Sequence, residues 1–250
     1  MLASELVDFL ESPDPELRDE IGYSTLAAWI YQSRLLEPDA IHGLNDRLLD
    51  NLKHGIGERD TDSVFRRSFS ALVLSVVVAR DNATPFLDAQ AIRRIEDSAL
   101  AYLNAEQDIR GYDPVKGWMH SAAHTADLLK FLARSRYLAQ PDQNRILDAI
   151  VTKLTQASVV FTHGEDERFA RTILSVVNRS DFNREAFRAW AKARPDRPTS
   201  ARPTVAELRA SQNMKNLLSK LEVLLSLNPQ PSESVQSAQG SVHEALKDLF

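Results

Sequence analysis

The chain has 250 residues, a net charge of −5, 43% hydrophobic residues and no cysteine. This composition is typical of a soluble globular protein, and the length allows one large domain or two small ones. The acidic balance argues against binding nucleic acid through a basic surface. The missing cysteines exclude disulfides and zinc sites built on thiolates.

The N-terminal segment is acidic and lacks the apolar core of a signal peptide. The longest apolar run, residues 71–79, is too short to cross a bilayer. We therefore expect a cytoplasmic protein with no membrane segment.

Apolar residues recur with a helical period along nearly the whole chain, and strand-like alternation is missing. Short loops separate the periodic segments, which favours antiparallel helical hairpins. We predict an all-α fold of the α-α superhelix type, with stacked hairpins as in HEAT or armadillo repeats. The predicted helices cover residues 2–11, 15–34, 38–54, 62–81, 88–105, 117–135, 142–160, 165–180, 183–194, 204–227 and 241–250.

We expect a single helical-repeat domain over residues 1–227. A shift of 100 residues aligns the similar apolar segments 69–81 and 169–181. A true internal repeat and a chance likeness between apolar helices both explain this alignment. Proline, serine and glutamine dominate residues 228–240, which predicts a flexible linker that is dispensable for folding. A short C-terminal helix, residues 241–250, follows it.

The most informative segment is RGYDPVKGWMHSAAHTAD, residues 110–127. It holds His120, His124 and Asp127, which are spaced i, i+4 and i+7 and would share one face of a helix. Two imidazoles and a carboxylate on one face can ligate a divalent metal such as Zn, Mn, Fe or Ni. The sequence therefore predicts a candidate metal site, which needs a further ligand from elsewhere.

Two other interpretations of these three residues stay open. The first is a structural hydrogen-bonded cluster in which Asp127 pairs with an arginine such as Arg110 or Arg168. The second is acid–base chemistry without a metal. A solvent-facing helix surface usually carries Lys, Glu and Arg, so imidazoles separated by small residues favour the inner, concave face of a superhelix.

A second dense segment, THGEDER, covers residues 162–168. We expect it to lie beside residues 113–120, because the helices predicted over 117–135 and 142–160 would form one antiparallel hairpin. Asp113, in the loop before the first of these helices, and His163 or Glu165 are then the candidate further ligands, and we expect at least one of them to share a cavity with His120, His124 and Asp127. Either Glu165 or Glu167 could act as a catalytic base, although acids in a first helical turn also simply stabilise the helix dipole.

The loop before residue 118 supplies candidate ligand-binding groups. Arg110 and Tyr112 could present an anion-binding fork and a hydroxyl at the rim of a cavity. Asp113 and His163 would complete that rim. Trp118 belongs to the same candidate set, although a tryptophan at a helix start is also read as a buried packing anchor.

Three segments carry a resemblance to a known family: RGYDPVKGWMHSAAHTADLL, FTHGEDERFA and NMKNLL. They are similar to a bacterial family catalogued as domain of unknown function 2785, over roughly residues 15–225. The resemblance implies an all-helical, repeat-like fold in a bacterial cytoplasmic protein. It brings no activity or catalytic residue to carry over, and the chain after Leu227 has no counterpart in it.

Two functions of different classes follow from the sequence. One is a binding or scaffold protein whose polar, His/Asp-lined cavity takes a small ligand or a peptide or protein partner. The other is a metal-dependent, hydrolase-like enzyme that uses His120, His124 and Asp127. Neither involves nucleic acid or a membrane, and both are compatible with a homo-oligomer.

Overall fold

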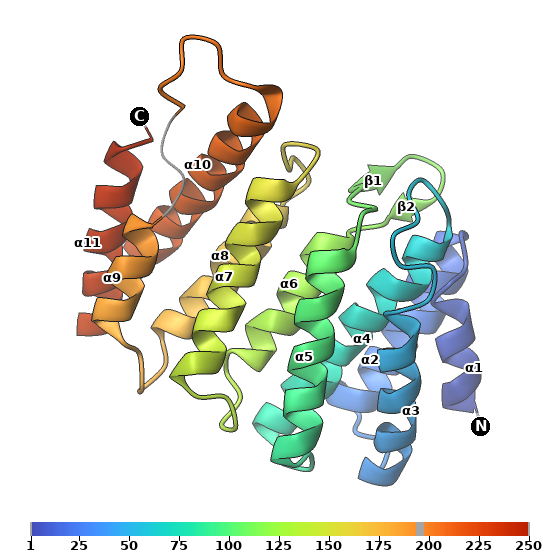
Figure 1. Ribbon diagram of the computed structural model, residues 1–250. Helices are drawn as coiled ribbons and strands as arrows, with labels where there is room; N and C mark the ends of the chain where they lie inside the picture. The colour runs from blue at the N-terminus through green and yellow to red at the C-terminus, as the bar shows by residue number, and fades with distance from the viewer. Residues whose placement is uncertain (1, 194–197, 250) are drawn as a thin grey trace. The chain divides into compact units, whose positions relative to one another are not determined.

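The computed structural model describes residues 2–193 and 198–249. The chain divides into two compact units, residues 1–137 and 138–250, where the sequence suggested one domain over residues 1–227. Both units are all-α (Figure 1), and the described residues include just two strands of two residues each. The helical prediction is therefore confirmed.

The first unit is built around one long central helix, α4. Its other helical elements are α1, the π-helical turns η1 and η2 on either side of the short α2, and α3, α5 and α6. Their bounds are α1 Leu2–Phe9, η1 Glu16–Ser24, α2 Thr25–Ala27, η2 Ala28–Gln32, α3 Pro38–Asn51, α4 Ser63–Ala83, α5 Ala89–Ala105 and α6 Ser121–Leu132.

Helix α4 is central because it is apolar on more than one face. Phe65, Phe69 and Val73 follow one face at a spacing of four, and all are at most 2% exposed. Leu74 on another face is equally buried, so the helix is enclosed on several sides. It packs most extensively against α6. It ends at Ala83 because the residue before Pro85 is driven out of the helical conformation.

The second unit is organised around α10, which packs against α7, α8 and α11. Its start is fixed by a capping box, in which Thr204 and Glu207 each accept a hydrogen bond from the other's backbone N–H. Leu217, Leu218 and Leu221 are fully buried and supply its core face. The helices of this unit are α7 Gln140–Gln156, α8 Glu165–Val177, α9 Arg184–Lys192, α10 Val205–Ser226 and α11 Glu233–Lys247.

The expected linker over residues 228–240 is wrong from Glu233 onward, where α11 begins. The Ser232 side chain caps this helix by accepting a hydrogen bond from the Val235 N–H at 3.3 Å. Val235, Ala238 and Val242 are at most 1% exposed and form a narrow apolar stripe against the rest of the unit. Small polar residues stand between these three positions in the sequence, so the apolar period of α11 is hard to recognise there.

Within each unit, helices two apart in the chain pack along one another: α4 along α6, and α8 along α10. Such second-neighbour packing is how a layered helical stack is built. An internal repeat stays a prediction. None of the helices in the described parts of the chain combines the length and the apolar character that crossing a membrane requires.

Candidate functional site

The segment between α5 and α6 folds into a short antiparallel hairpin at one end of the first unit's helices (Figure 1). Its strands are β1 (Tyr112–Asp113) and β2 (Gly117–Trp118), with Tyr112 opposite Trp118. We call residues 112–118 the aromatic hairpin. It carries several of the candidate residues.

The turn of the aromatic hairpin is built by Asp113 and Gly117. The Asp113 carboxylate accepts hydrogen bonds at 2.8 Å from the backbone N–H groups of Lys116 and Val115. These two bonds hold the pKa of Asp113 below its usual value. Gly117 has a φ of 75°, which favours glycine. Asp113 thus has a structural role in the turn.

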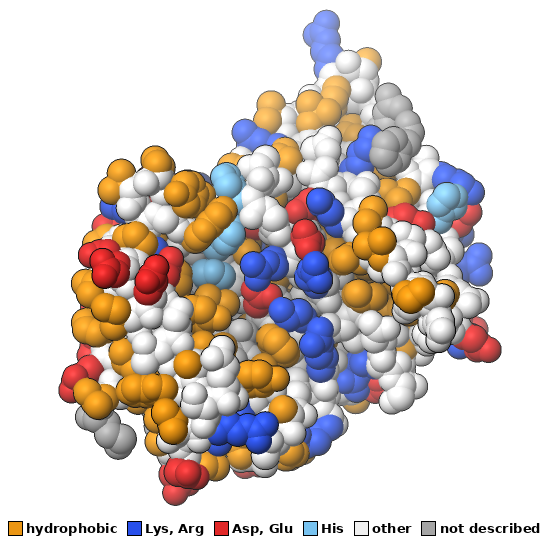
Figure 2. All heavy atoms as spheres, turned by 180° about the vertical axis from the view of Figure 1, so that it is seen from behind, with side chains coloured by type: hydrophobic (Ala, Val, Ile, Leu, Met, Phe, Trp, Pro, Cys, Tyr) orange, Lys and Arg blue, Asp and Glu red, His pale blue; other side chains and the backbone are white. Residues whose placement is uncertain are grey.

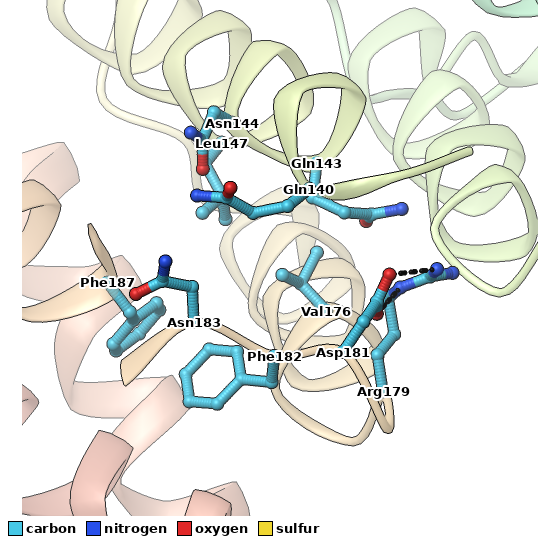
Figure 3. Close-up of a pocket in the computed structure, with 10 residues that line it drawn as sticks. All are labelled: Gln140, Gln143, Asn144, Leu147, Val176, Arg179, Asp181, Phe182, Asn183 and Phe187. Atoms are coloured by element: carbon cyan, nitrogen blue, oxygen red, sulfur yellow. Dashed lines mark hydrogen bonds and ion pairs between the residues drawn. The ribbon is translucent and has the colours of Figure 1, made fainter. Parts of the chain in front are cut away.

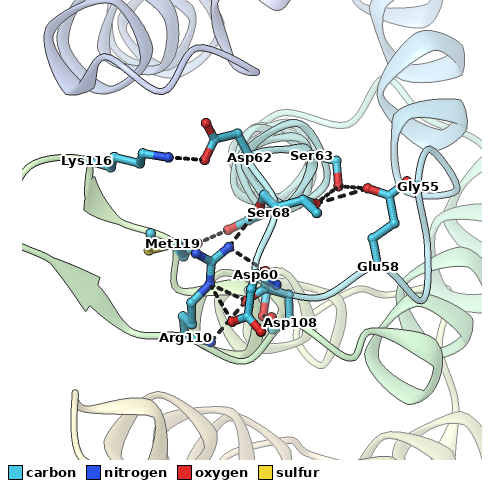
Figure 4. Close-up of polar contacts among 12 residues, drawn as sticks. Gly55, Glu58, Asp60, Asp62, Ser63, Ser68, Asp108, Arg110, Lys116 and Met119 are labelled. Carbon is cyan, nitrogen blue, oxygen red and sulfur yellow. Dashed lines mark hydrogen bonds and ion pairs between the residues drawn. The ribbon is translucent and has the colours of Figure 1, made fainter.

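Three groups anchor the aromatic hairpin to the helices beneath it. Arg18 of η1 is fully buried and donates from Nη2 to the Lys116 carbonyl oxygen at 2.7 Å. Lys116 Nζ lies 2.6 Å from an Asp62 carboxylate oxygen (Figure 4). The Ser68 hydroxyl of α4 donates to the Met119 carbonyl oxygen just beyond the hairpin. Contacts from η1, and from α4 and the residue before it, therefore hold the hairpin in place.

A buried ion-pair network fixes the loop leading into the hairpin. Arg67 of α4 is fully buried and binds the Glu106 carboxylate through Nε at 2.6 Å and Nη2 at 3.2 Å. Glu106 in turn accepts from the Asp108 N–H at 2.9 Å. The Asp108 carboxylate then binds the Arg110 guanidinium at 2.8 and 2.5 Å (Figure 4). Two nitrogens of the Arg110 guanidinium thus bind Asp108, and anion binding by Arg110 stays a prediction.

Helix α6 begins at Ser121, four residues later than predicted. His120 precedes the helix in the left-handed conformation, with φ 47°. The predicted shared helix face of His120, His124 and Asp127 is therefore wrong for His120. Trp118 lies in β2 and is 41% exposed, so its reading as a buried anchor is also wrong. Residues 117–118 pair with β1 and form no additional helical turn.

Five rings are in contact one after another from the surface into the core, and we call this series the ring stack. Trp118 stacks on His120 with ring centroids 4.2 Å apart, and Tyr112 lies 4.7 Å from Trp118. On the inner side, His120 meets the edge of His124 at 5.7 Å, and His124 meets Phe69 at 4.9 Å. Tyr112 is 50% exposed whereas Phe69 is 2% exposed. The outer rings are thus held by a chain of contacts that ends in the core.

His124 is tied to α4 by a polar contact, with its Nδ1 2.8 Å from the Ser68 hydroxyl oxygen. A serine hydroxyl has one proton, and that of Ser68 goes to the Met119 carbonyl. The Nδ1–H of His124 is therefore the donor to Ser68. Asp127, one turn on, binds Lys130 Nζ at 2.7 Å. These contacts fit the structural interpretation of His124 and Asp127.

Within residues 2–193 and 198–249, the structure contains no group of three or more histidine, aspartate or glutamate side chains that could hold a metal ion. His124 is 7% exposed and Asp127 is 4% exposed, and both have the protein partners given above. Metal binding by His120, His124 and Asp127 stays a prediction that this arrangement does not favour.

The acidic candidates of the second unit have structural partners at the start of α8. The His163 N–H donates to the Glu165 carboxylate at 2.9 Å, and Glu165 is 2% exposed. Glu167 binds Arg171 Nη2 at 2.6 Å, and this hydrogen bond lowers the pKa of Glu167. The His163 side chain is exposed, and Figure 2 shows histidine side chains reaching the surface on one face. That this segment shares a site with His120 stays a prediction.

The strained backbone of His120 allows a direct test of its role. A left-handed non-glycine residue costs about 1–2 kcal/mol, and the lost ring stack costs about 0.5–1.5 kcal/mol. We therefore expect His120→Gly to leave the free energy of unfolding within about 1 kcal/mol of the wild type in urea titrations. The control, His120→Val, should be clearly less stable because a β-branched residue resists this φ. A loss of several kcal/mol in His120→Gly would mean that the ring is a core element.

Comparison with known proteins identifies a family. The family model described as Protein of unknown function (DUF2785) matches residues 52–223. The matched range includes the whole aromatic hairpin and the start of α8. No curated protein and no solved structure gives a significant match.

Proposed function

The chain belongs to the family of proteins of unknown function DUF2785, and we propose that it is a binding protein that docks a protein or peptide partner on the aromatic hairpin. The observation that carries this proposal is the ring stack. Tyr112 and Trp118 are exposed, yet contacts continuing to Phe69 in the core hold them fixed. Tyrosine and tryptophan dominate the binding energy of many interfaces.

The rigidity of the aromatic hairpin also favours its role as a surface that binds a partner. Binding costs free energy when side chains and loops must become ordered, and a surface that is already ordered avoids this cost. The aromatic hairpin is held by Arg18, Asp62 and Ser68 before any partner arrives. The strained φ of His120 is the kind of backbone conformation that gathers at ligand-binding sites.

The shape favours a macromolecular partner over a small ligand. Small molecules bind in concave pockets that bury most of their surface. On the hairpin, Val115 in the turn is 79% exposed, and Tyr112 and Trp118, which pair with each other at its open end, are 50% and 41% exposed. These side chains offer a partner an exposed apolar surface rather than a concave pocket.

Two broader features complete the proposal. The second-neighbour helix packing within each unit supports a helical-repeat scaffold of the α-solenoid type. The acidic composition without cysteine supports action in a reducing compartment, the bacterial cytoplasm.

The test compares two alanine variants with a matched control. Tyr112→Ala and Trp118→Ala should each weaken partner affinity at least about tenfold, which corresponds to about 1.4 kcal/mol or more. Tyr31→Ala, which removes a similarly exposed tyrosine of η2 (46% exposed), should change affinity less than about twofold. Proteins that co-purify with the wild type but not with Trp118→Ala are first identified, and their affinities are then measured by calorimetry. Equal affinities for all three variants would contradict the proposal.

A further inference from the structure

The second unit has a groove between α9 and α11, two helices that lie side by side in Figure 1. They pack against each other, and Arg184 and Glu233 form an ion pair at 2.7 Å where both helices begin. The groove has a volume of about 620 Å³ and is lined by residues of α9 and of the second half of α11. This volume lies within the range of pockets that hold small molecules.

A second depression of this unit is too small to hold a ligand. It lies between α7 and the segment that joins α8 to α9, and Figure 3 shows Arg179 and Asp181 paired with each other there. Its volume of about 20 Å³ admits about one water molecule. The groove between α9 and α11 therefore differs from it in size, and it also differs in its charged groups.

Two cations of α9 line the groove without a protein partner. Arg188 and Lys192 are one helical turn apart, which places their Cβ atoms about 6 Å from each other on one face of the helix. Both are exposed, and neither side chain has an ion pair or hydrogen bond with any residue that the structure describes. A phosphate group carries up to two negative charges and three oxygens that accept hydrogen bonds, so one such group can engage both cations.

The carboxylates of the groove do not cancel these two cations. Glu244 accepts a hydrogen bond from Lys247 Nζ at 2.7 Å. This bond is the main cause that lowers the pKa of Glu244, and the nearby charge of Arg188 lowers it further. Asp248 is the other acid, so the described lining residues include three cations and two carboxylates. The groove therefore favours an anion beside α9 and offers carboxylate acceptors beside the end of α11.

Gly240 leaves the groove open above the middle of α11. Glycine within a helix lowers stability relative to alanine, and Gly240 has no positive φ that would require glycine. A Cβ atom at this position would meet no other atom within 4 Å, so close packing does not require glycine either. Because Gly240 lines the groove, a longer side chain there would extend into the space that a ligand needs.

We infer that this groove binds a small phosphate monoester whose remainder carries hydroxyl groups, such as a sugar phosphate. Its phosphate lies between Arg188 and Lys192, and its hydroxyls donate to the carboxylate of Asp248 and meet the hydroxyl of Ser237. No aromatic ring is among the described residues that line the groove, so a nucleobase would find no ring to stack on. This site lies in the second unit and is independent of the aromatic hairpin.

The probes are glucose 6-phosphate, ribose 5-phosphate and glycerol 3-phosphate, with glucose and phenyl phosphate for comparison. Calorimetry on the full chain is done at low ionic strength, because salt screens exposed charges. At least one hydroxyl-bearing phosphate should bind, with glucose at least tenfold weaker and phenyl phosphate severalfold weaker. Binding by none of the three, or equal binding of phenyl phosphate, would overturn the assignment. Tighter binding of a phosphoserine peptide would overturn it in favour of a protein ligand.

Charge variants test the two cations. Arg188→Gln and Lys192→Gln change exposed side chains, so the fold should be kept. Each should weaken binding of the phosphate probe at least fivefold. The matched control is Lys220→Gln, the loss of an exposed lysine of α10, which should change affinity less than twofold. An equal, weak effect of all three changes would mean that the cations form only a solvated surface.

A glycine variant tests the groove without changing any charge. Gly240→Met should weaken binding at least tenfold by filling the groove, while the melting temperature stays equal or rises because a helix glycine is removed. The control is Gly43→Met, the same change at a glycine of α3 that also has open space beside it. This control should leave affinity unchanged. Equal affinities in the wild type, Gly240→Met and Arg188→Gln would refute the site.

Discussion

Replacing Glu106 by alanine is expected to lower the free energy of unfolding by about 3–5 kcal/mol. The change leaves the Arg67 guanidinium fully buried without its carboxylate partner. Burial alone would lower the pKa of Arg67, but the hydrogen bond and charge of Glu106 more than offset this and raise it. Arg67 is therefore held charged in the fold, and its remaining acceptors are neutral oxygens of His54, Gly55 and Ser63.

Urea titration followed by far-UV circular dichroism measures this effect. The double variant Arg67→Met/Glu106→Leu should lose less stability than the sum of the two single changes, because it removes both charges together. Glu167→Ala breaks the exposed pair with Arg171 and serves as the control, with an expected loss below about 1 kcal/mol. A similar small loss in Glu106→Ala would show that the buried pair does not stabilise the loop before the aromatic hairpin.

Removal of all residues after Leu227 is expected to destabilise the second unit by about 3–6 kcal/mol. The deletion exposes the surface covered by α11, where Val235 and Val242 are buried, and each buried valine contributes about 1.5–3 kcal/mol. Trp190 of α9 is a suitable probe, since α9 packs against α11. With Trp29 and Trp118 of the first unit replaced by phenylalanine, its fluorescence should report a melting temperature lowered by several degrees.

A milder variant controls for the length of the deletion. Val242→Ala should lower the melting temperature in the same direction but by less, since it removes fewer buried methyl groups. Gln230→Ala, in the exposed turn before α11, should have no measurable effect. If the deletion left the melting temperature unchanged, α11 would not be docked in solution, and the flexible tail predicted from composition would be right.

Most helices could be predicted from the sequence because their signals are local. The helix predicted over residues 204–227 is α10, Val205–Ser226, which has both a strong apolar period and a capping box. Prediction failed where the deciding contact is distant in sequence. The late start of α6 depends in part on Ser68, which binds the Met119 carbonyl from 51 residues away.

The sequence indicated which residues of the candidate site lie near one another better than it indicated what surrounds them. His120 and His124 do lie together, with ring centroids 5.7 Å apart, yet their neighbours are aromatic rings and a serine. Val115 was missed entirely, although Asp113-Pro114 and Gly117 are turn signals that expose the residue between them. Nothing in the sequence indicated that Arg67 and Glu106 pair, because they are 39 residues apart and each resembles an ordinary surface charge.

Photo-crosslinking at the tip of the aromatic hairpin tests the proposed binding surface most directly. Val115 is replaced by the photoreactive residue p-benzoylphenylalanine in the intact protein, and the protein is irradiated in its native cells. We expect one discrete adduct with another protein, and we expect the Trp118→Ala change to remove it. The same photoreactive residue at Val223, which is 53% exposed in the second unit, should not give this adduct. An adduct that persists in Trp118→Ala, that forms equally at Val223, or that never forms at Val115 would contradict a partner-binding role for the aromatic hairpin.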